Sequence, residues 1–218
     1  DGYTILIHHI GMSTAPALYR KLPYNPMTDF EPIGLINEVP MTLVAKNDFP
    51  AKDLKELIAY VKANKEKVNY ANAGLGAASH LCGMIFMSAI QTDVTTVPYS
   101  GTAPAMNDLL GGQVDFMCDQ TASLPNVPTM DEAGLKGFEV SIWHALYAPK
   151  GTPKPVIDKL TNALQDAMKD STVKQRFADL GTEPVALNRA TPAALSAHLK
   201  AEIDRWGPII KKAGVYAD

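Results

Sequence analysis

The stretch VNYANAGLGAASHLCGMIFMSAI, residues 68–90, holds a strand, a glycine loop and a helix in succession. Residues 68–71 form a short apolar run of the kind that makes a buried strand. Residues 81–90 are apolar at helical spacing, and Gly74 and Gly76 lie in the loop between the two segments. A strand that leads directly into a helix is the building unit of α/β folds, so this stretch decides the fold class.

The same alternation continues on both sides of this stretch. We expect strands at residues 3–7, 33–36, 41–45, 95–97, 114–118 and 138–147, the first of them buried. Helices are predicted after Ser13 or Thr14 as N-cap, from Asp53, and from Pro104 to residue 110. Three further helical stripes occupy the last third, where Thr191 caps the final helix and Pro192 starts it. The sequence therefore predicts an α/β fold with mostly parallel sheets.

Two lobes are expected. Pro40 separates two predicted strands, and the composition changes near Ala122. We therefore predict that residues 1–38 and 122–218 form one discontinuous, partial lobe, and that residues 39–121 form the other.

The composition excludes several classes of protein. A chain of 218 residues that is 46% hydrophobic and 20% charged is an ordinary globular protein, not a disordered one. The net charge of -3 and the absence of a basic run argue against nucleic acid as a partner. No apolar run approaches the roughly 18 residues of a membrane-spanning helix.

The two cysteines, Cys82 and Cys118, match no zinc-binding spacing. They are either two small buried side chains or one disulfide, which requires an oxidising compartment. The sequence alone leaves both possibilities open.

The glycine loop can bind an anion. Gly74 and Gly76 let the backbone approach a ligand closely, and the amides of the following helix start point their partial positive charge at it. The hydroxyl of Ser79 adds another donor. The loop could equally be an ordinary turn that starts a helix, because two glycines alone are a weak signal, and Ser79 takes the position of the third glycine of a dinucleotide fingerprint.

Two other strand-to-helix junctions could line the same ligand. The loop from Tyr99 to Pro104 offers a phenol, the hydroxyls of Ser100 and Thr102, and free amides. Residues 8–14 form the third junction. Loops of this kind meet beyond the carboxyl ends of strands, where α/β proteins bind ligands.

No catalytic constellation is visible. The sequence has no nucleophile elbow and no paired histidines at metal-binding spacing. Adjacent His8 and His9 cannot both face inward, and His80 and His144 read as solvated or core residues. Trp143 reads as core.

Several segments together resemble one known family. They include DGYTIL at 1–6, DFEPI at 29–33, residues 70–80, VPYSGTAPA at 97–105, LLGGQVD at 109–115, residues 127–129 and residues 138–153. In this order they resemble the receptor proteins of tripartite tricarboxylate transporters, the Bug family, over nearly the whole chain.

The resemblance implies a two-lobed periplasmic-binding-protein-like α/β fold with a cleft between the lobes, and a receptor that captures a small carboxylate or amino acid. It implies periplasmic localisation after loss of a signal peptide, membrane subunits of a tripartite tricarboxylate transporter as partners, a monomer, no cofactor and no metal. Compared with the family, the chain lacks an N-terminal strand–helix–strand stretch and a hinge-region segment after Asp119, which puts independent binding in doubt.

The ligand carboxylate is expected at the helix start near Ala78, held by the amides of Gly76 to Ser79. The expected ligand-binding residues are Ser13, Thr14, Ala73, Gly74, Gly76, Ala77, Ala78, Ser79, His80, Tyr99, Ser100, Gly101, Thr102 and Asp119. Two other hypotheses stay open: an α/β enzyme that holds a phosphate or carboxylate substrate with the Gly74–Gly76 loop, and a fragment that does not bind.

Overall fold

The computed structural model describes residues 2–120, 130–135, 140–214 and 216. It divides into two compact units, which we call unit 1 (Asp1–Val39 and Ile142–Asp218) and unit 2 (Pro40–Ser141). The first crossing lies next to the predicted one, but the second lies at residues 141–142 and not at Ala122. Met130 and Ala133 line one surface pocket together with Leu54 and Leu57, which places them with unit 2. Residues 122–129 and 138, which contribute to the predicted boundary and the family pattern, lie outside the described residues.

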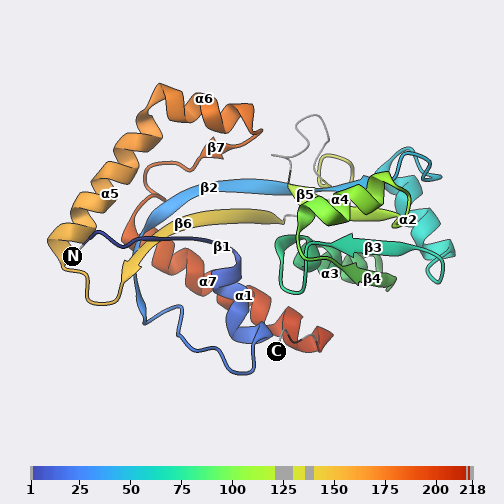
Figure 1. Ribbon diagram of the computed structural model, residues 1–218, viewed down its shortest axis with the longest axis horizontal. Coiled ribbons are helices and arrows are strands. Elements are labelled where there is room, and N and C mark those ends of the chain that lie inside the picture. The colour runs from blue at the N-terminus through green and yellow to red at the C-terminus, as the bar shows by residue number, and fades with distance from the viewer. Residues whose placement is uncertain (1, 121–129, 136–139, 215, 217–218) are drawn as a thin grey trace. The chain divides into compact units, whose positions relative to one another are not determined.

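Unit 1 is built on a sheet with strand order β1-β6-β2, and β7 pairs with β2 (Figure 1). Its strands β1 and β6 are antiparallel, as are β2 and β7. Its elements are β1 (Leu6–His9), α1 (Gly11–Leu18), the first part of β2 (Phe30–Ala45), β6 (Ser141–Pro149), α5 (Lys154–Lys169), α6 (Ser171–Asp179), β7 (Glu183–Pro184) and α7 (Pro192–Ala213).

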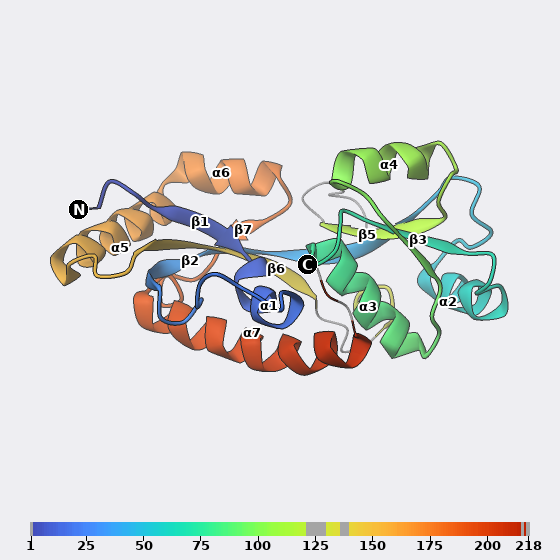
Figure 2. The same cartoon turned by 60° about the horizontal axis from the view of Figure 1, so that its bottom comes forward.

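Helix α1 begins earlier than predicted. Its N-cap is Ile10, so Ser13 and Thr14 lie inside the helix and do not cap it. Both are buried, and their hydroxyls donate to the carbonyls of Ile10 and Gly11. A hydroxyl that bonds to a carbonyl of its own helix turn is not available as a cap. The apolar residues on both sides of Ser13 place this stretch in the core. Helix α1 packs against α7 (Figure 2).

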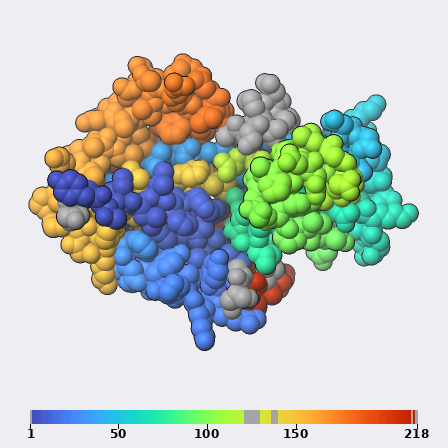
Figure 3. Space-filling model, in the orientation of Figure 1, coloured from blue at the N-terminus to red at the C-terminus, as the bar shows by residue number. Residues whose placement is uncertain are grey.

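The first strand is not the buried strand that the sequence predicts. It covers Leu6–His9, and Ile5 and Ile7 are 50% and 62% exposed. The N-terminal residues, dark blue in Figure 3, lie at the surface of unit 1. Among the described residues β1 pairs only with β6, so it is an edge strand with one solvent-facing side.

Unit 2 has the strand order β2-β5-β3-β4. It contains the second part of β2, α2 (Leu54–Ala63), β3 (Asn69–Asn72), α3 (Ala78–Ile90), β4 (Thr95–Pro98), α4 (Thr102–Leu110) and β5 (Phe116–Gln120). Parallel pairing occurs at β3/β4 and β3/β5, whereas β2 and β5 are antiparallel. The prediction of mostly parallel strands is therefore correct for β3, β4 and β5 of unit 2. It is wrong for the antiparallel strand pairs of unit 1.

Strand β2 joins two strands that the sequence predicts as separate. It runs through Pro40 without interruption. Before Pro40, Asn37 and Glu38 pair with β7, and after it Met41 begins the pairing with β5. Proline lacks an amide proton, so it fits where a strand changes partners and no donor is needed.

The core of unit 1 contains a buried carboxylate. Glu202 of α7 accepts hydrogen bonds from the indole Nε1 atoms of Trp206, at 2.8 Å, and Trp143, at 3.3 Å. Both tryptophans are 1% exposed, so Trp143 is a core residue as the sequence predicts. Buried donors need an acceptor, and this one side chain supplies it for two of them.

Replacing Glu202 with Leu should lower the free energy of unfolding by about 2–4 kcal/mol, because two buried indole donors then lack a partner. Glu202→Gln keeps an acceptor and should cost less. Asp204→Asn on the same helix is the control, since it removes only an exposed pair with Lys200. Urea unfolding measures all three, and equal losses for Glu202→Leu and Asp204→Asn would contradict the assignment.

The two cysteines form a disulfide. Cys82 of α3 is bonded to Cys118 of β5, with 6.2 Å between the Cα atoms. It links segments 36 residues apart in the sequence and so restricts the unfolded chain.

The double variant Cys82→Ala/Cys118→Ala should lose about 4 kcal/mol of stability, as expected for a loop of this length. The measurement is urea unfolding of both proteins with and without reductant, and reductant should affect only the wild type. Two reactive thiols in unfolded, unreduced wild-type protein would show that the disulfide is absent.

Candidate functional site

Unit 2 contains the strand arrangement at which α/β proteins bind ligands. The chain passes from β3 through α3 to its neighbour β4, and then returns through α4 to β5 on the other side of β3. The helices α3 and α4 therefore cover opposite faces of the sheet (Figure 2). Ligands bind beyond the carboxyl ends of the strands at such a reversal, here the ends of β3 and β5.

Most amide donors of the glycine loop between β3 and α3 are already bonded to acceptors within residues 72–80. Gly74 and Gly76 have φ of 119° and 75°, a region that favours glycine. The Gly76 amide donates to Nδ1 of His80 at 3.2 Å, and the Ala77 amide donates to the carbonyl of Gly74 at 3.1 Å. These two amides, which the sequence analysis assigns to the ligand, already have partners inside the loop.

The Ser79 hydroxyl also stabilises the loop. Its oxygen accepts from the Ala73 amide at 2.9 Å, which leaves the hydroxyl proton to donate elsewhere. The first amides of α3, those of Ala78, Ser79 and His80, have no hydrogen-bond acceptor among the described residues. The available donors therefore lie within the first turn of the helix, about one residue later than predicted.

His80 is a structural residue of the loop. Because its Nδ1 accepts the Gly76 amide, the ring proton lies on Nε2. Burial lowers the pKa of His80, so the ring is neutral near pH 7. His80 consequently shapes the helix start and adds no positive charge to it.

The loop after β4 lies against the glycine loop. The Tyr99 amide donates to the carbonyl of Asn72 at 2.9 Å, and a Cβ at Gly74 would lie 3.0 Å from the Tyr99 carbonyl oxygen. The Tyr99 hydroxyl donates to Asp108 at 2.7 Å, so it is not the free phenol that the sequence suggests. Ser100 and Thr102 are exposed, and Gly101 is the N-cap of α4. The structure thus brings the two predicted loops together.

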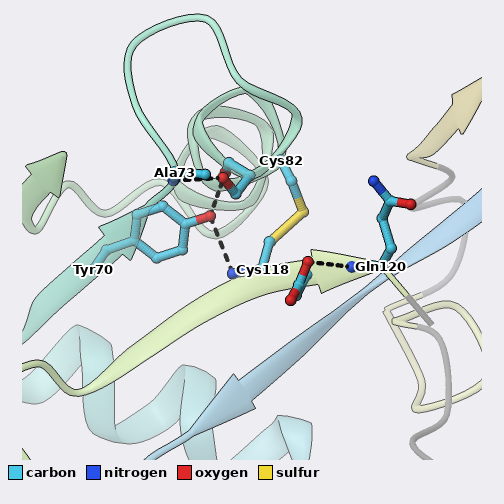
Figure 4. Close-up of a disulfide and its surroundings, with 7 residues drawn as sticks. Tyr70, Ala73, Cys82, Cys118 and Gln120 are labelled. Atoms are coloured by element: carbon cyan, nitrogen blue, oxygen red, sulfur yellow. Dashed lines mark hydrogen bonds between the residues drawn. A yellow bond between two sulfur atoms is a disulfide. The ribbon is translucent and has the colours of Figure 1, made fainter. Parts of the chain in front are cut away.

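The first turn of α3 is held to β5 by buried groups (Figure 4). The Tyr70 hydroxyl donates to the Ser79 carbonyl and accepts the Cys118 amide. Tyr70 is fully buried, and a Cβ at Gly83 would overlap its ring, so α3 can approach only because Gly83 has no side chain. With the disulfide, these contacts determine where the unpaired amides lie.

Two buried polar atoms at the strand ends have no partner among the described residues. They are Nδ2 of Asn72, at the end of β3, and Oδ2 of Asp119, near the end of β5. The Oδ1 atom of each side chain accepts a backbone amide, that of Gly74 for Asn72 and that of Gln120 for Asp119. Asn72 is not among the ligand-binding residues that the sequence predicts. An Asn at a strand end before a glycine loop is the signal that could have found it.

The remaining predicted groups lie elsewhere. Ser13 and Thr14 belong to unit 1, and so do His8, His9 and His144. The Nδ1 of His144 lies 2.9 Å from the side-chain oxygen of Asn37, so this ring has a partner in the protein. In the described part of the chain, no group of three His, Cys, Asp or Glu residues is arranged to hold a metal ion. The same residues contain no helix long and apolar enough to cross a membrane.

A protein-family model matches almost the whole chain. The family is the tripartite tricarboxylate transporter family receptor, matched at residues 1–123 and 116–215. A UPF0065 protein of Agrobacterium vitis is 48% identical over 98% of this chain and 68% of its own length. That alignment has 237 positions, more than the 218 residues of the chain, so the relative contains internal residues that this chain lacks.

Solved structures agree with this match. The periplasmic binding protein BugD is 50% identical, with a TM-score of 0.87, over 100% of this chain and 80% of that one. MatC from Rhodopseudomonas palustris, solved with bound malate, is 37% identical, with a TM-score of 0.84, over 96% of this chain and 80% of that one. The predicted fold class and family are therefore confirmed, and the chain belongs to the receptor family of tripartite tricarboxylate transporters, as a protein with the periplasmic-binding-protein fold.

Proposed function

We propose that the protein is an extracytoplasmic receptor that captures a small carboxylate or amino acid and delivers it to the membrane subunits of a tripartite tricarboxylate transporter. The observation that carries the proposal is the start of α3. Three consecutive amides there lack acceptors among the described residues, while the loop before them satisfies most of its own donors.

The physical argument concerns the cost of holding an anion. Unpaired amides at a helix start offer donors and a favourable dipole, and no lysine or arginine has to be buried. Each charge-assisted hydrogen bond contributes about 1.5–3 kcal/mol, so three near the upper end of this range reach the roughly 8 kcal/mol of micromolar affinity. The bound malate of MatC, a relative at 37% identity, supports a carboxylate as the ligand class.

The proposal includes binding without catalysis, export to the periplasm and a monomeric state. The relationship to periplasmic binding proteins supports the first two. A binding role also requires that the ligand be recovered unchanged after incubation with the protein, which product analysis can check. The contributions of Ser13 and Thr14 from unit 1 and of the loop from Tyr99 to Thr102 remain predictions.

Ala78→Pro is a sharp test of the helix start. Proline is tolerated at the first helical position, and Ala77 has φ of -64° and ψ of 159°, which suits a residue before proline. The substitution removes one unpaired amide without breaking a described hydrogen bond. We expect Kd for the best small carboxylate of a panel to rise at least about tenfold, measured by calorimetry on the full-length protein.

Ser171→Pro is the matched control. It places proline at the first position of α6, after Asp170 with φ of -62° and ψ of 131°, and should leave Kd unchanged. Equal affinity of wild type and Ala78→Pro for the ligand would place the anion elsewhere.

A further inference from the structure

One hydrogen-bond donor and one acceptor near the ends of β3 and β5 have no partner among the described residues. Asn72 is 0% exposed and Asp119 is 6% exposed, yet one polar atom of each lacks a partner among the described residues. Leaving such atoms unpaired in the interior is unfavourable, and proteins retain them mainly where a ligand or an ordered water completes them.

Asn72 ends the strand that leads into the proposed carboxylate site, and Asp119 lies near the end of a neighbouring strand. Strands β3 and β5 are parallel neighbours, and adjacent strands are about 4.8 Å apart. Cys118, the residue before Asp119, is tied to α3 by the disulfide and by the Tyr70 hydroxyl (Figure 4). The end of β5 therefore has a defined position relative to the first turn of α3.

The alternation of side chains places Asp119 on a particular side. Cys118 faces α3, so Asp119 faces the opposite side of the sheet, where α4 lies (Figure 2). A ligand across the strand ends would meet the α3 amides with one group and the Asp119 carboxylate with another. Repulsion excludes a second ligand carboxylate from that position, whereas a hydroxyl or ammonium group fits it.

We infer that the ligand carries, in addition to its carboxylate, a hydrogen-bond donor, either a hydroxyl or an ammonium group. Asp119 accepts this donor, and the Asn72 amide donates to the ligand carboxylate. This inference rests on the proposed carboxylate site and specifies its ligand class. It makes Asp119 the residue that distinguishes hydroxy and amino acids from plain carboxylates.

The alternative is that both atoms hold an ordered water and stabilise the fold. The two roles differ in the ligand-free protein. Burial raises the pKa of Asp119, so keeping this carboxylate ionised near pH 7 costs stability. If Asp119 serves the ligand, Asp119→Asn should raise the Tm of the ligand-free protein by about 2–4 °C, whereas a structural role would lower it.

Calorimetry of the full-length protein with malate, aspartate and succinate is the decisive test. These four-carbon diacids carry a hydroxyl, an ammonium or no donor beside the carboxylate. The wild type should bind malate or aspartate at least about tenfold more tightly than succinate. Asp119→Asn should weaken that ligand about 10- to 150-fold and leave succinate unchanged or improved. The weakened ligand identifies the donor as hydroxyl or ammonium.

Asn72→Asp tests the second residue. It keeps the oxygen that accepts the Gly74 amide but replaces the donor, so all three ligands should bind about tenfold more weakly or worse. Asp166→Asn, on an exposed position of α5, is the control and should change nothing.

Three results would overturn the inference: equal loss for all ligands in Asp119→Asn, a wild-type preference for succinate, or no binding of malate and aspartate. The last result leaves the proposed function to be decided separately by the carboxylate panel and Ala78→Pro.

Discussion

The position of the first turn of α3 depends on the hydroxyl of Tyr70. This one oxygen donates to the Ser79 carbonyl and accepts the Cys118 amide, so it connects a helix start to the neighbouring strand inside the core. The close approach is possible because Gly83 has no side chain, and the disulfide one turn further along makes the connection covalent. Every property of the candidate site follows from this placement, because the unpaired amides have a fixed direction only if the helix start cannot move.

The loop before α3 shows how the protein separates structural donors from available ones. The amides of Ala73, Gly74, Gly76 and Ala77 all find acceptors within residues 72–80. A loop that satisfied fewer of its own donors would compete with the helix for an anion and would be less ordered. Apart from that of exposed Leu75, the amides of residues 73–80 without an acceptor among the described residues are therefore those of the first helical turn, which share one direction and the helix dipole.

The Asn72 and Asp119 side chains differ from the loop amides, because each keeps one polar atom without a partner among the described residues. A stable core avoids unpaired polar atoms, and the carboxylate of Glu202 in unit 1 shows the usual solution, with two indole donors directed at it. Unit 2 leaves a donor and an acceptor without a partner among the described residues at the carboxyl ends of β3 and β5, the edge at which α/β proteins generally bind ligands. Stability is commonly sacrificed at functional sites in this way, since a group that the protein has already satisfied cannot recognise a ligand.

Local patterns in the sequence determined most of the elements and indicated where the candidate site lies. Helix α7 starts at Pro192 after Thr191, α2 follows its cap Asp53, and the glycine loop joins β3 to α3, because caps, prolines and apolar spacing act over a few residues. Tertiary structure alone decided the rest. It merged two predicted strands through Pro40, left Ile5 and Ile7 exposed, and used the Gly76 amide for His80. It also left Oδ2 of Asp119 without a partner among the described residues. Each of these outcomes depends on groups distant in the sequence or on competition for one hydrogen bond. A linear pattern of residue types does not record which group forms that bond.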